Sequence, residues 1–142
     1  MIKQTVTQLV EKHRSSNPYE IASQNNVLVL FEELGDMLGY FNTYNRIKMI
    51  HINNHVDEQL QRFTCAHELG HSVLHPGVNT PFLRKNTLTS IDRIEREANQ
   101  FAVEMLLPDQ LLLDGMTLYE AAQICGVPKE VACLKRTPKR SY

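Results

Sequence analysis

The sequence predicts a small α+β fold that is mostly helical, and three observations carry this prediction. Helix start signals and apolar residues at helical spacing recur along most of the chain. Short β-rich segments occur at 27–31, 40–44 and 47–52. A long helical stretch follows them and contains the motif His67-Glu68-Leu69-Gly70-His71. We therefore expect one domain in which a small three-stranded sheet precedes the motif helix.

Composition limits the classes of protein to which the chain can belong. At 142 residues, with 42% hydrophobic and 22% charged residues, it suits one globular domain over 1–142. The net charge of −1 gives no general reason to expect nucleic-acid binding. No segment reads as a signal peptide or a membrane span. The three cysteines lack a paired spacing, which favours reduced thiols and a cytoplasmic protein.

Two helices are expected before the sheet. Residues 3–14 have one apolar side and are interpreted as a scaffold helix. Asn17-Pro18-Tyr19-Glu20 is a strong start signal for a second helix, with an N-cap, a proline in the first turn and a glutamate three residues after the cap. Asn25-Asn26 ends this short helix near Gln24.

The β-rich segments suggest a strand and a hairpin. Residues 27–31 are apolar and β-branched, and 40–44 and 47–52 flank a turn at Asn45-Arg46. His51 and His55 show no ligand spacing, so we interpret them as surface or turn histidines. If strand 47–52 lies at the sheet edge, it could pair with an extended substrate by β-augmentation.

The motif helix is expected from Asp57 to His75, where Pro76-Gly77 stops it. At about 100° per residue, its polar side chains gather in one stripe on an otherwise apolar helix. The stripe consists of Thr64, His67, Glu68, His71 and His75.

His67 and His71 lie one turn apart, so both imidazoles can reach one Zn²⁺ at about 2.0–2.1 Å. Glu68 projects about 100° further round and is the expected general base, which holds the attacking water. His75 lies about 12 Å along the axis from His67 and is excluded as a ligand. The alternative is a set of buried, hydrogen-bonded histidines without a metal. Cys65 points away from the stripe and is interpreted as a packing residue.

A catalytic zinc usually has a third protein ligand, which must come from elsewhere in the chain. After an irregular stretch at 76–89, which we expect to form a substrate rim and a gate, Ser90 is expected to cap a helix over 91–107. Glu95 falls on its apolar face and Glu97 on its solvated face, about 200° apart.

A buried carboxylate needs a partner, because burying a charged group without one costs on the order of several kcal/mol. Zinc would supply that partner for Glu95, and a salt bridge to a buried arginine is the alternative. Asn99, four residues on, would accept a hydrogen bond from the non-ligating nitrogen of His67 or His71.

The C-terminal part suggests further helices. Thr117-Leu118-Tyr119-Glu120 is a capping box for a helix ending near Gly126, and Pro128 starts another. This rhythm permits a helix-turn-helix, but its second helix has no Asn, Gln or Arg in its first turn to read bases, so nucleic acid is an unlikely partner. The basic residues of 135–142 are expected to form a solvated tail, with contact to an acidic partner or phosphate as the alternative. They are Lys135, Arg136, Lys139 and Arg140.

The motif at 67–71, the run 95–102 (Glu-Arg-Glu-Ala-Asn-Gln-Phe-Ala) and Leu106-Leu107-Pro108 together resemble the ImmA/IrrE family of zinc metallopeptidases, over about residues 19–134. The resemblance implies a zincin-like fold with the metal between the two motif helices. The Glu95–Asn99 spacing is similar to that of gluzincin peptidases, in which the residue four positions after the glutamate ligand is often acidic. In this chain that residue is Asn99.

The resemblance also implies a partner. Family members of integrative elements and prophages act on a repressor that carries a helix-turn-helix, and the short chain leaves no room for the C-terminal sensor domain of the stress-response branch, so the mobile-element branch is favoured. We expect zinc-dependent cleavage of such a repressor. Tyr40, Tyr44 and His75 are candidates for stabilising the oxyanion. The alternative is a zinc-containing anti-repressor module without proteolysis, against which the retained Glu68 argues.

Overall fold

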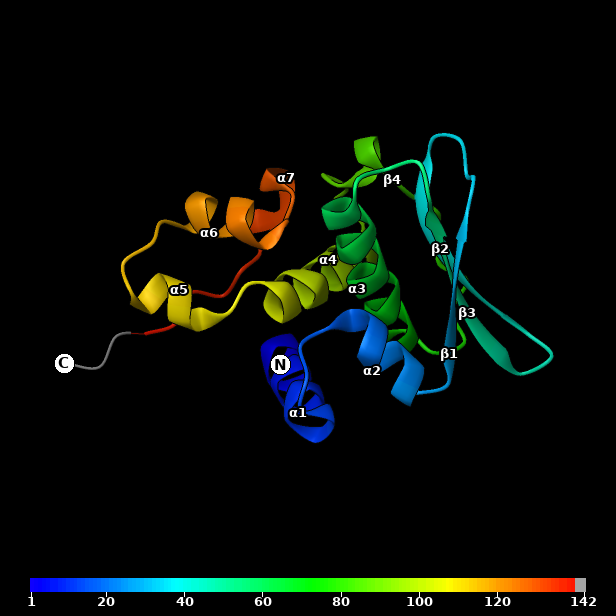
Figure 1. Ribbon diagram of the computed structural model, residues 1–142, viewed down its shortest axis with the longest axis horizontal. Helices are drawn as coiled ribbons and strands as arrows, with labels where there is room; N and C mark the ends of the chain where they lie inside the picture. Colours follow the sequence, from blue (N-terminus) through cyan, green and yellow to red (C-terminus); the bar gives the residue numbers. More distant parts are fainter. Residues whose placement is uncertain (140–142) are drawn as a thin grey trace.

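The computed structural model describes residues 1–139 and places a mixed sheet at one end of a helical body (Figure 1). Helices α5, α6 and α7 lie at the other end, with α3 and α4 between them and the sheet. The predicted α+β class is confirmed. The elements in order are α1 (Ile2–His13), α2 (Pro18–Gln24), β1 (Val27–Glu32), β2 (Met37–Tyr44), β3 (Ile47–Asn53), α3 (Glu58–Leu74), β4 (Leu83–Arg84), the 3-10 helix η1 (Lys85–Thr87), α4 (Arg93–Leu106), α5 (Asp109–Leu113), α6 (Leu118–Cys125) and α7 (Lys129–Ala132).

Two helices begin at the caps that the sequence predicts, and α3 begins at the expected place, with Asp57 as its cap. The side chain of Asn17 accepts a hydrogen bond from the backbone of Tyr19 at 3.0 Å, and that of Asp57 accepts one from Leu60 at 2.8 Å. Thr117 and Glu120 form the expected capping box of α6. Each cap satisfies backbone N–H groups that the first turn of a helix leaves without partners.

The start of α4 is a correction. We expected Ser90 as the cap, but the N-cap is Asp92, whose Oδ1 accepts a hydrogen bond from the backbone of Ile94 at 3.0 Å. Ser90 lies one step back, and its hydroxyl oxygen accepts from the Asp92 N–H at 3.1 Å. Both residues have cap chemistry, and the second of them starts the helix.

The sheet has the strand order β1-β3-β2-β4. β1 pairs parallel to β3, and β2 pairs antiparallel to both β3 and β4. The fourth strand, β4, was not expected, because it lies in the stretch predicted to be irregular. Because β3 pairs with β1 on one side and with β2 on the other, it is an interior strand. The expectation that strand 47–52 could offer a free edge to a substrate is therefore wrong.

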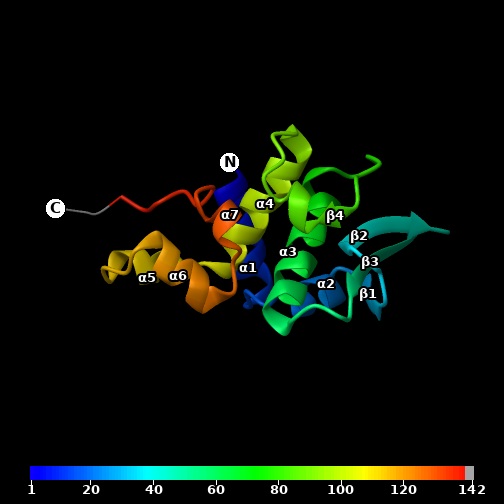
Figure 2. The same cartoon turned by 90° about the horizontal axis from the view of Figure 1, so that it is seen from above.

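Two glycines allow α3 to lie close to both of its neighbours. A Cβ at Gly39 would lie 2.5 Å from the Thr64 side chain, so β2 approaches α3 only without one. A Cβ at Gly70 would lie 3.0 Å from the ring of Phe101 on α4. Figure 2 shows α3 between the sheet and α4. The motif helix is thus enclosed on two sides, and its middle is apolar core apart from the polar stripe.

One of the two histidines near β3 differs from expectation. His55 is exposed in the turn after β3, as predicted. His51 is buried: one ring nitrogen contacts Glu32, and Nε2 lies 2.8 Å from Oδ1 of Asn42. Its ring stacks on Tyr40 with 4.2 Å between centroids. Cross-strand partners on β1 and β2 supply these contacts, and β3 alone gives no sign of them.

The basic tail is also partly different. Lys135 is buried, and its Nζ donates to Glu104 at 2.7 Å and to Asp109 at 2.6 Å, so its placement in a solvated tail is wrong. Lys139 is exposed as expected, and Arg140 lies outside the described residues. α7 has only four residues, which is about one turn and too short for a recognition helix that reads a groove. Within residues 1–139, no helix combines the length and apolar character needed to cross a membrane.

Candidate metal centre

The motif residues of α3 converge with one residue of α4 inside the protein. His67, Glu68 and His71 are 0% exposed, and Glu95 is 2% exposed. Candidate ligand atoms of His67, His71 and Glu95 all lie within 4.8 Å of one another. Nε2 of His71 is 2.7 Å from Oε1 of Glu95, and Nε2 of His67 is 3.6 Å from its Oε2. The structure thus brings together the three residues that the sequence predicts as ligands.

Asn99 orients His67. Its Oδ1 lies 2.8 Å from Nδ1 of His67, and its Nδ2 donates to the backbone oxygen of Leu88 at 3.3 Å. The second contact assigns the amide orientation, because only the NH₂ group can donate to a carbonyl. His67 therefore donates through Nδ1–H, and its Nε2 faces Glu95 and His71.

Buried polar atoms without hydrogen-bond partners support a cation at this point. Within residues 1–139, Nε2 of His67, Oε2 of Glu95 and both carboxylate oxygens of Glu68 are buried without a hydrogen-bond partner. Each buried polar atom left unpaired costs about 1–3 kcal/mol, and more for a charged group. A metal ion bound by two imidazoles and a carboxylate would satisfy the ligand atoms, and this is the donor set of catalytic zinc sites. The residues present therefore fit a zinc ion.

The two buried carboxyl groups have opposite protonation tendencies. Burial raises the pKa of Glu68 to about 8, partly opposed by the nearby His67 and reinforced by Glu95. Burial also acts on Glu95, but hydrogen bonds and charge from His67 and His71 outweigh it and hold its pKa at about 2. Glu95 is thus the group that stays ionised, as a metal ligand must, whereas Glu68 can exchange a proton near neutrality. A bound cation would lower the pKa of Glu68.

His75 and Glu97 join the site, although neither is a member of the ligand cluster. Nδ1 of His75 lies 3.0 Å from Nδ1 of His71, and its Nε2 lies 2.9 Å from Oε1 of Glu97. His75 is therefore outside the metal position, as expected from its spacing. Glu97 is not simply solvated, because its side chain is only 31% exposed and accepts this bond. The i+4 spacing of His71 and His75 was the only sequence signal for this link.

The segment between α3 and α4, called the wall segment below, contacts the site through Asn99. Leu83 is fully buried, Leu88 is 5% exposed, and Leu88 contacts Asn99 through its carbonyl. We expected the loop 76–89 to be weakly packed throughout. That holds for 76–82, where the residues are mostly exposed, but the second half is anchored by β4 and these leucines. The same segment exposes Val78 and Phe82.

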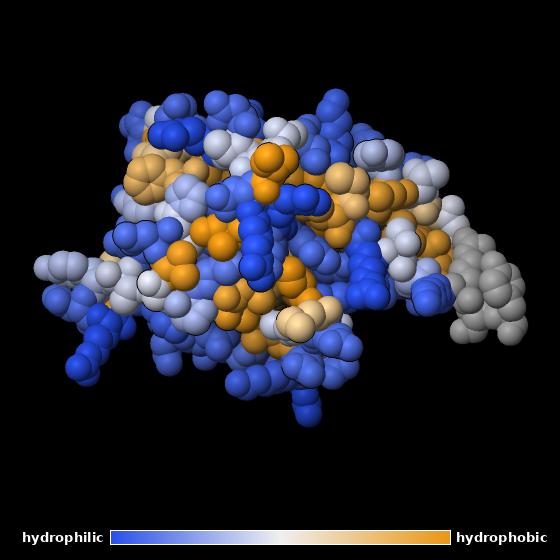
Figure 3. Space-filling model, turned by 180° about the vertical axis from the view of Figure 1, so that it is seen from behind, coloured by the Kyte–Doolittle hydropathy of each residue, from blue (hydrophilic) through white to orange (hydrophobic). Residues whose placement is uncertain are grey.

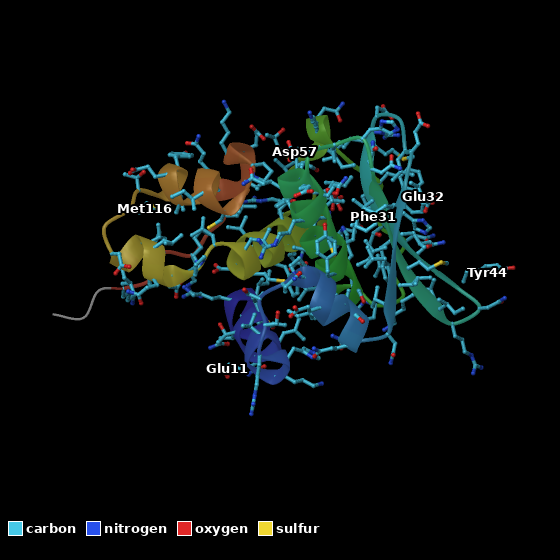
Figure 4. All side chains as sticks on the ribbon, in the orientation of Figure 1. Glu11, Phe31, Glu32, Tyr44, Asp57 and Met116 are labelled. Atoms are coloured by element: carbon cyan, nitrogen blue, oxygen red, sulfur yellow. The ribbon has the colours of Figure 1, made fainter. Side chains whose placement is uncertain are left out.

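The three expected oxyanion candidates occupy different surroundings. Tyr44 is 66% exposed and projects from the hairpin tip away from the helices (Figure 4). Tyr40 lies between the rings of His51 and Phe82. His75 is already bonded to His71 and Glu97. Tyr44 is therefore eliminated. The ring contacts of Tyr40 do not involve its hydroxyl, so Tyr40 remains a candidate.

A helix bearing two histidines and a glutamate, with a carboxylate supplied by the next long helix, defines the class of HExxH metallopeptidases. The chain belongs to peptidase family M78, because residues 22–136 match the IrrE N-terminal-like domain of that family. The predicted resemblance to ImmA/IrrE metallopeptidases is thereby confirmed. A metallopeptidase requires a metal, and the cluster described above is the place where one fits.

Two relatives cover almost all of the chain. The "uncharacterized immunity region protein 2" of Bacillus phage phi105 is 44% identical over 140 residues, which is 95% of this chain and 89% of the phage protein. The metallopeptidase ImmA of Bacillus subtilis (strain 168) is 31% identical over 149 residues, which is 99% of this chain and 87% of that protein. The chain is therefore similar to an immunity region protein of a phage and to a metallopeptidase along almost its whole length.

Proposed function

We propose that this metallopeptidase uses zinc to cleave a cognate helix-turn-helix repressor of a prophage or other mobile element, and thereby relieves repression. The observation that carries the proposal is the position of Glu68, buried beside three convergent ligand candidates with both carboxylate oxygens unpartnered. The names of the two relatives, an immunity region protein and a metallopeptidase, support the biological setting. We further propose that residues 1–142 act as one domain in the cytoplasm, where its three free cysteines stay reduced.

The roles of the residues follow from their chemistry. His67, His71 and Glu95 would hold the zinc ion, and Asn99 keeps His67 in the ligating tautomer. When bound, zinc polarises a scissile carbonyl and lowers the pKa of the attacking water. Glu68 takes a proton from that water and returns it to the leaving amine, a role for which a pKa near neutrality is suited. Burial of all four groups excludes bulk water and strengthens these interactions.

A zinc-containing module that only binds its partner is the second candidate. A structural zinc site normally has four protein ligands. The cluster in the described part of the chain offers three, and the residue beside it is a carboxylate free to act as a base. This arrangement favours catalysis over sequestration.

The experiment that separates these candidates is Glu68→Ala. It keeps all three ligand candidates, so the variant should fold and bind zinc, but cleavage should fall by about 10²-fold or more without the general base. A reporter gene would measure repression in cells. Incubation of the purified protein with the repressor would show whether cleavage fragments form. His67→Ala serves as the metal-free control. If Glu68→Ala relieves repression at the normal level, the peptidase proposal is wrong and the binding module replaces it.

A further inference from the structure

An ion pair followed by two hydrogen bonds leads from the protein surface to one of the ligand candidates. Arg93 is exposed and lies 3.6 Å from Oε2 of Glu97, whose Oε1 is 2.9 Å from Nε2 of His75. His75 is 8% exposed and its Nδ1 is 3.0 Å from Nδ1 of His71. The backbone N–H of His75 also donates to the carbonyl of His71 at 2.9 Å, at the point where α3 ends. The two rings are therefore fixed relative to each other by the backbone as well.

The partners determine where the protons of a neutral pair lie. A carboxylate only accepts hydrogen bonds, so Nε2 of His75 must donate to Glu97. The Nδ1 atom of a neutral His75 then carries a lone pair and accepts. Nε2 of His71 lies 2.7 Å from Oε1 of Glu95, and a metal ion held by both groups would take the place of the proton between them. His71 then donates to His75 through its own Nδ1–H, and the lone pair of its Nε2 is directed at the metal position.

We propose that His75 and Glu97 are positioning residues that hold His71 in the tautomer and ring orientation needed to bind the metal through Nε2. The proposal rests on the metal site of the proposed function. Each candidate ligand histidine then has its own hydrogen-bond partner, which either lies on α4 or is bonded to a residue of α4. For His67 this is the neutral amide of Asn99, and for His71 it is His75, supported by the carboxylate of Glu97.

The charge of Glu97 distinguishes the two supports. A hydrogen bond to an ionised acceptor is about twice as strong as one between neutral groups, and it polarises the next bond in the chain. His71 is therefore the more strongly held ligand. Loss of such outer partners typically costs about 10–100-fold in metal affinity. A purely structural His75, which only fills space at the end of α3, would affect folding and leave zinc affinity unchanged.

Zinc affinity measured by chelator competition separates these possibilities. His75→Leu removes the acceptor at constant bulk, and we expect affinity to fall by about 10–100-fold. His75→Asn places an oxygen near the position of Nδ1 and should recover most of the loss. Glu97→Ala should show an intermediate loss, whereas Arg93→Ala, at the exposed end of the chain, should match the wild type.

Nitrogen-15 NMR of the zinc-loaded protein tests the tautomers directly. We expect a proton on Nδ1 of His71, a proton on Nε2 of His75 and none on Nδ1 of His75. Glu97→Ala should make His75 a mixture of tautomers. Circular dichroism and thermal melting of the metal-free variants control for folding, and if His75→Leu does not fold, His75→Asn and Glu97→Ala carry the test.

Equal zinc affinity in Glu97→Ala and the wild type, or protons on both ring nitrogens of His75, would overturn the proposal. Neither measurement requires proteolysis, so its failure is distinct from failure of the peptidase assignment. Conversely, a Glu68→Ala variant that still relieves repression would leave the tautomer result unchanged.

Discussion

Asn99 on α4 accepts a hydrogen bond from His67 on α3, with 2.8 Å between Oδ1 and Nδ1. The other end of the same amide donates to the carbonyl of Leu88 in the segment that walls the site. One buried side chain thus connects a ligand candidate to the polypeptide that encloses it. We therefore expect a movement of that segment to disturb the orientation of His67 through this amide.

Changes at Asn99 should separate these two bonds. Asn99→Ala removes both, and we expect zinc affinity to fall by about 10-fold or more. Asn99→Asp keeps the acceptor for His67 but loses the donor to Leu88, so it should bind zinc and expose the segment 83–92 to faster hydrogen exchange. Chelator competition and amide exchange measure the two effects. Unchanged zinc affinity in Asn99→Ala would contradict the role assigned to the His67 contact.

Zinc content tests the ligand set. Purified protein should carry about one zinc per chain, and His67→Ala and Glu95→Ala should lose it. Glu97→Ala should still load about one zinc at saturating metal, because Glu97 lies outside the cluster, even though its affinity is expected to be weaker. Elemental analysis that finds equal zinc in Glu95→Ala and the wild type would remove Glu95 from the ligand set.

Local chemistry made most of the framework predictable. Caps such as Asn17 and the box at Thr117 depend only on neighbouring residues, and they were found from the sequence. The same holds for the faces of α3 and α4, since helical spacing alone separates Glu95 from the outer face. Asn99 was predictable for the same reason, because it lies one turn after Glu95.

Contacts between distant segments were not predictable in the same way. The burial of His51 depends on Glu32, a neighbour only because β1 pairs parallel to β3. Lys135 is buried because Glu104 and Asp109 meet its ammonium group. β4 has too few residues to give an alternating pattern, and it is a strand only because β2 is beside it. Each error came from a partner that the local sequence does not announce.

Lys135 is expected to be a major determinant of stability. Its side chain is 1% exposed, as is that of its partner Glu104. Removing one partner of a buried ion pair costs about 3–5 kcal/mol, because the other charge stays buried. Lys135→Met should lower the free energy of unfolding by that amount in urea denaturation, while Lys139→Met, at an exposed position, should have little effect. A change of less than about 1 kcal/mol for Lys135→Met, the size typical of a surface pair, would contradict this assignment.

The same cluster should contribute to acid sensitivity. Burial tends to raise the pKa of Asp109, but hydrogen bonds from Lys135 and Lys3 lower it below its ordinary value. A lowered folded-state pKa means that the stabilisation is complete above the unfolded pKa of about 3.9 and is lost as pH falls through the folded value. In acid titrations followed by circular dichroism, Lys135→Met should show a weaker dependence over this window than the wild type. If Lys135→Met and the wild type lost structure over the same acid range with the same steepness, the ion pair would not be the source of the acid sensitivity.

The enclosed site should give narrow substrate specificity. His67, Glu68 and His71 are fully buried, so a substrate reaches them only after part of the protein moves, and we expect the wall segment to be that part. If the open state is rarely populated without a partner, the activity on general substrates is reduced to the fraction of molecules that are open.

The surface also suits contact with a protein partner. The face of the molecule opposite that of Figure 1 has apolar side chains within a polar surface (Figure 3). Phe82 and Ile91 of the wall segment are exposed. We expect negligible cleavage of casein and cleavage of the co-encoded repressor at one or a few bonds, mapped by mass spectrometry. Broad digestion of casein would contradict this specificity.

A reversible lock on the wall segment tests whether its movement is required. Met37 on β2 and Arg84 on β4 are antiparallel partners. Such pairs have Cα atoms about 4.5–5.5 Å apart, within the range of a disulfide. The oxidised Met37→Cys/Arg84→Cys protein should hold β4 against the sheet and cleave the repressor far more slowly than the wild type, and reduction should restore the rate. Each single substitution controls for the loss of the original side chain, and zinc content controls for the site. If the oxidised and reduced forms cleave the repressor equally fast, the substrate enters without displacement of β4, and the entrance must lie on the exposed half of the segment, at 76–82.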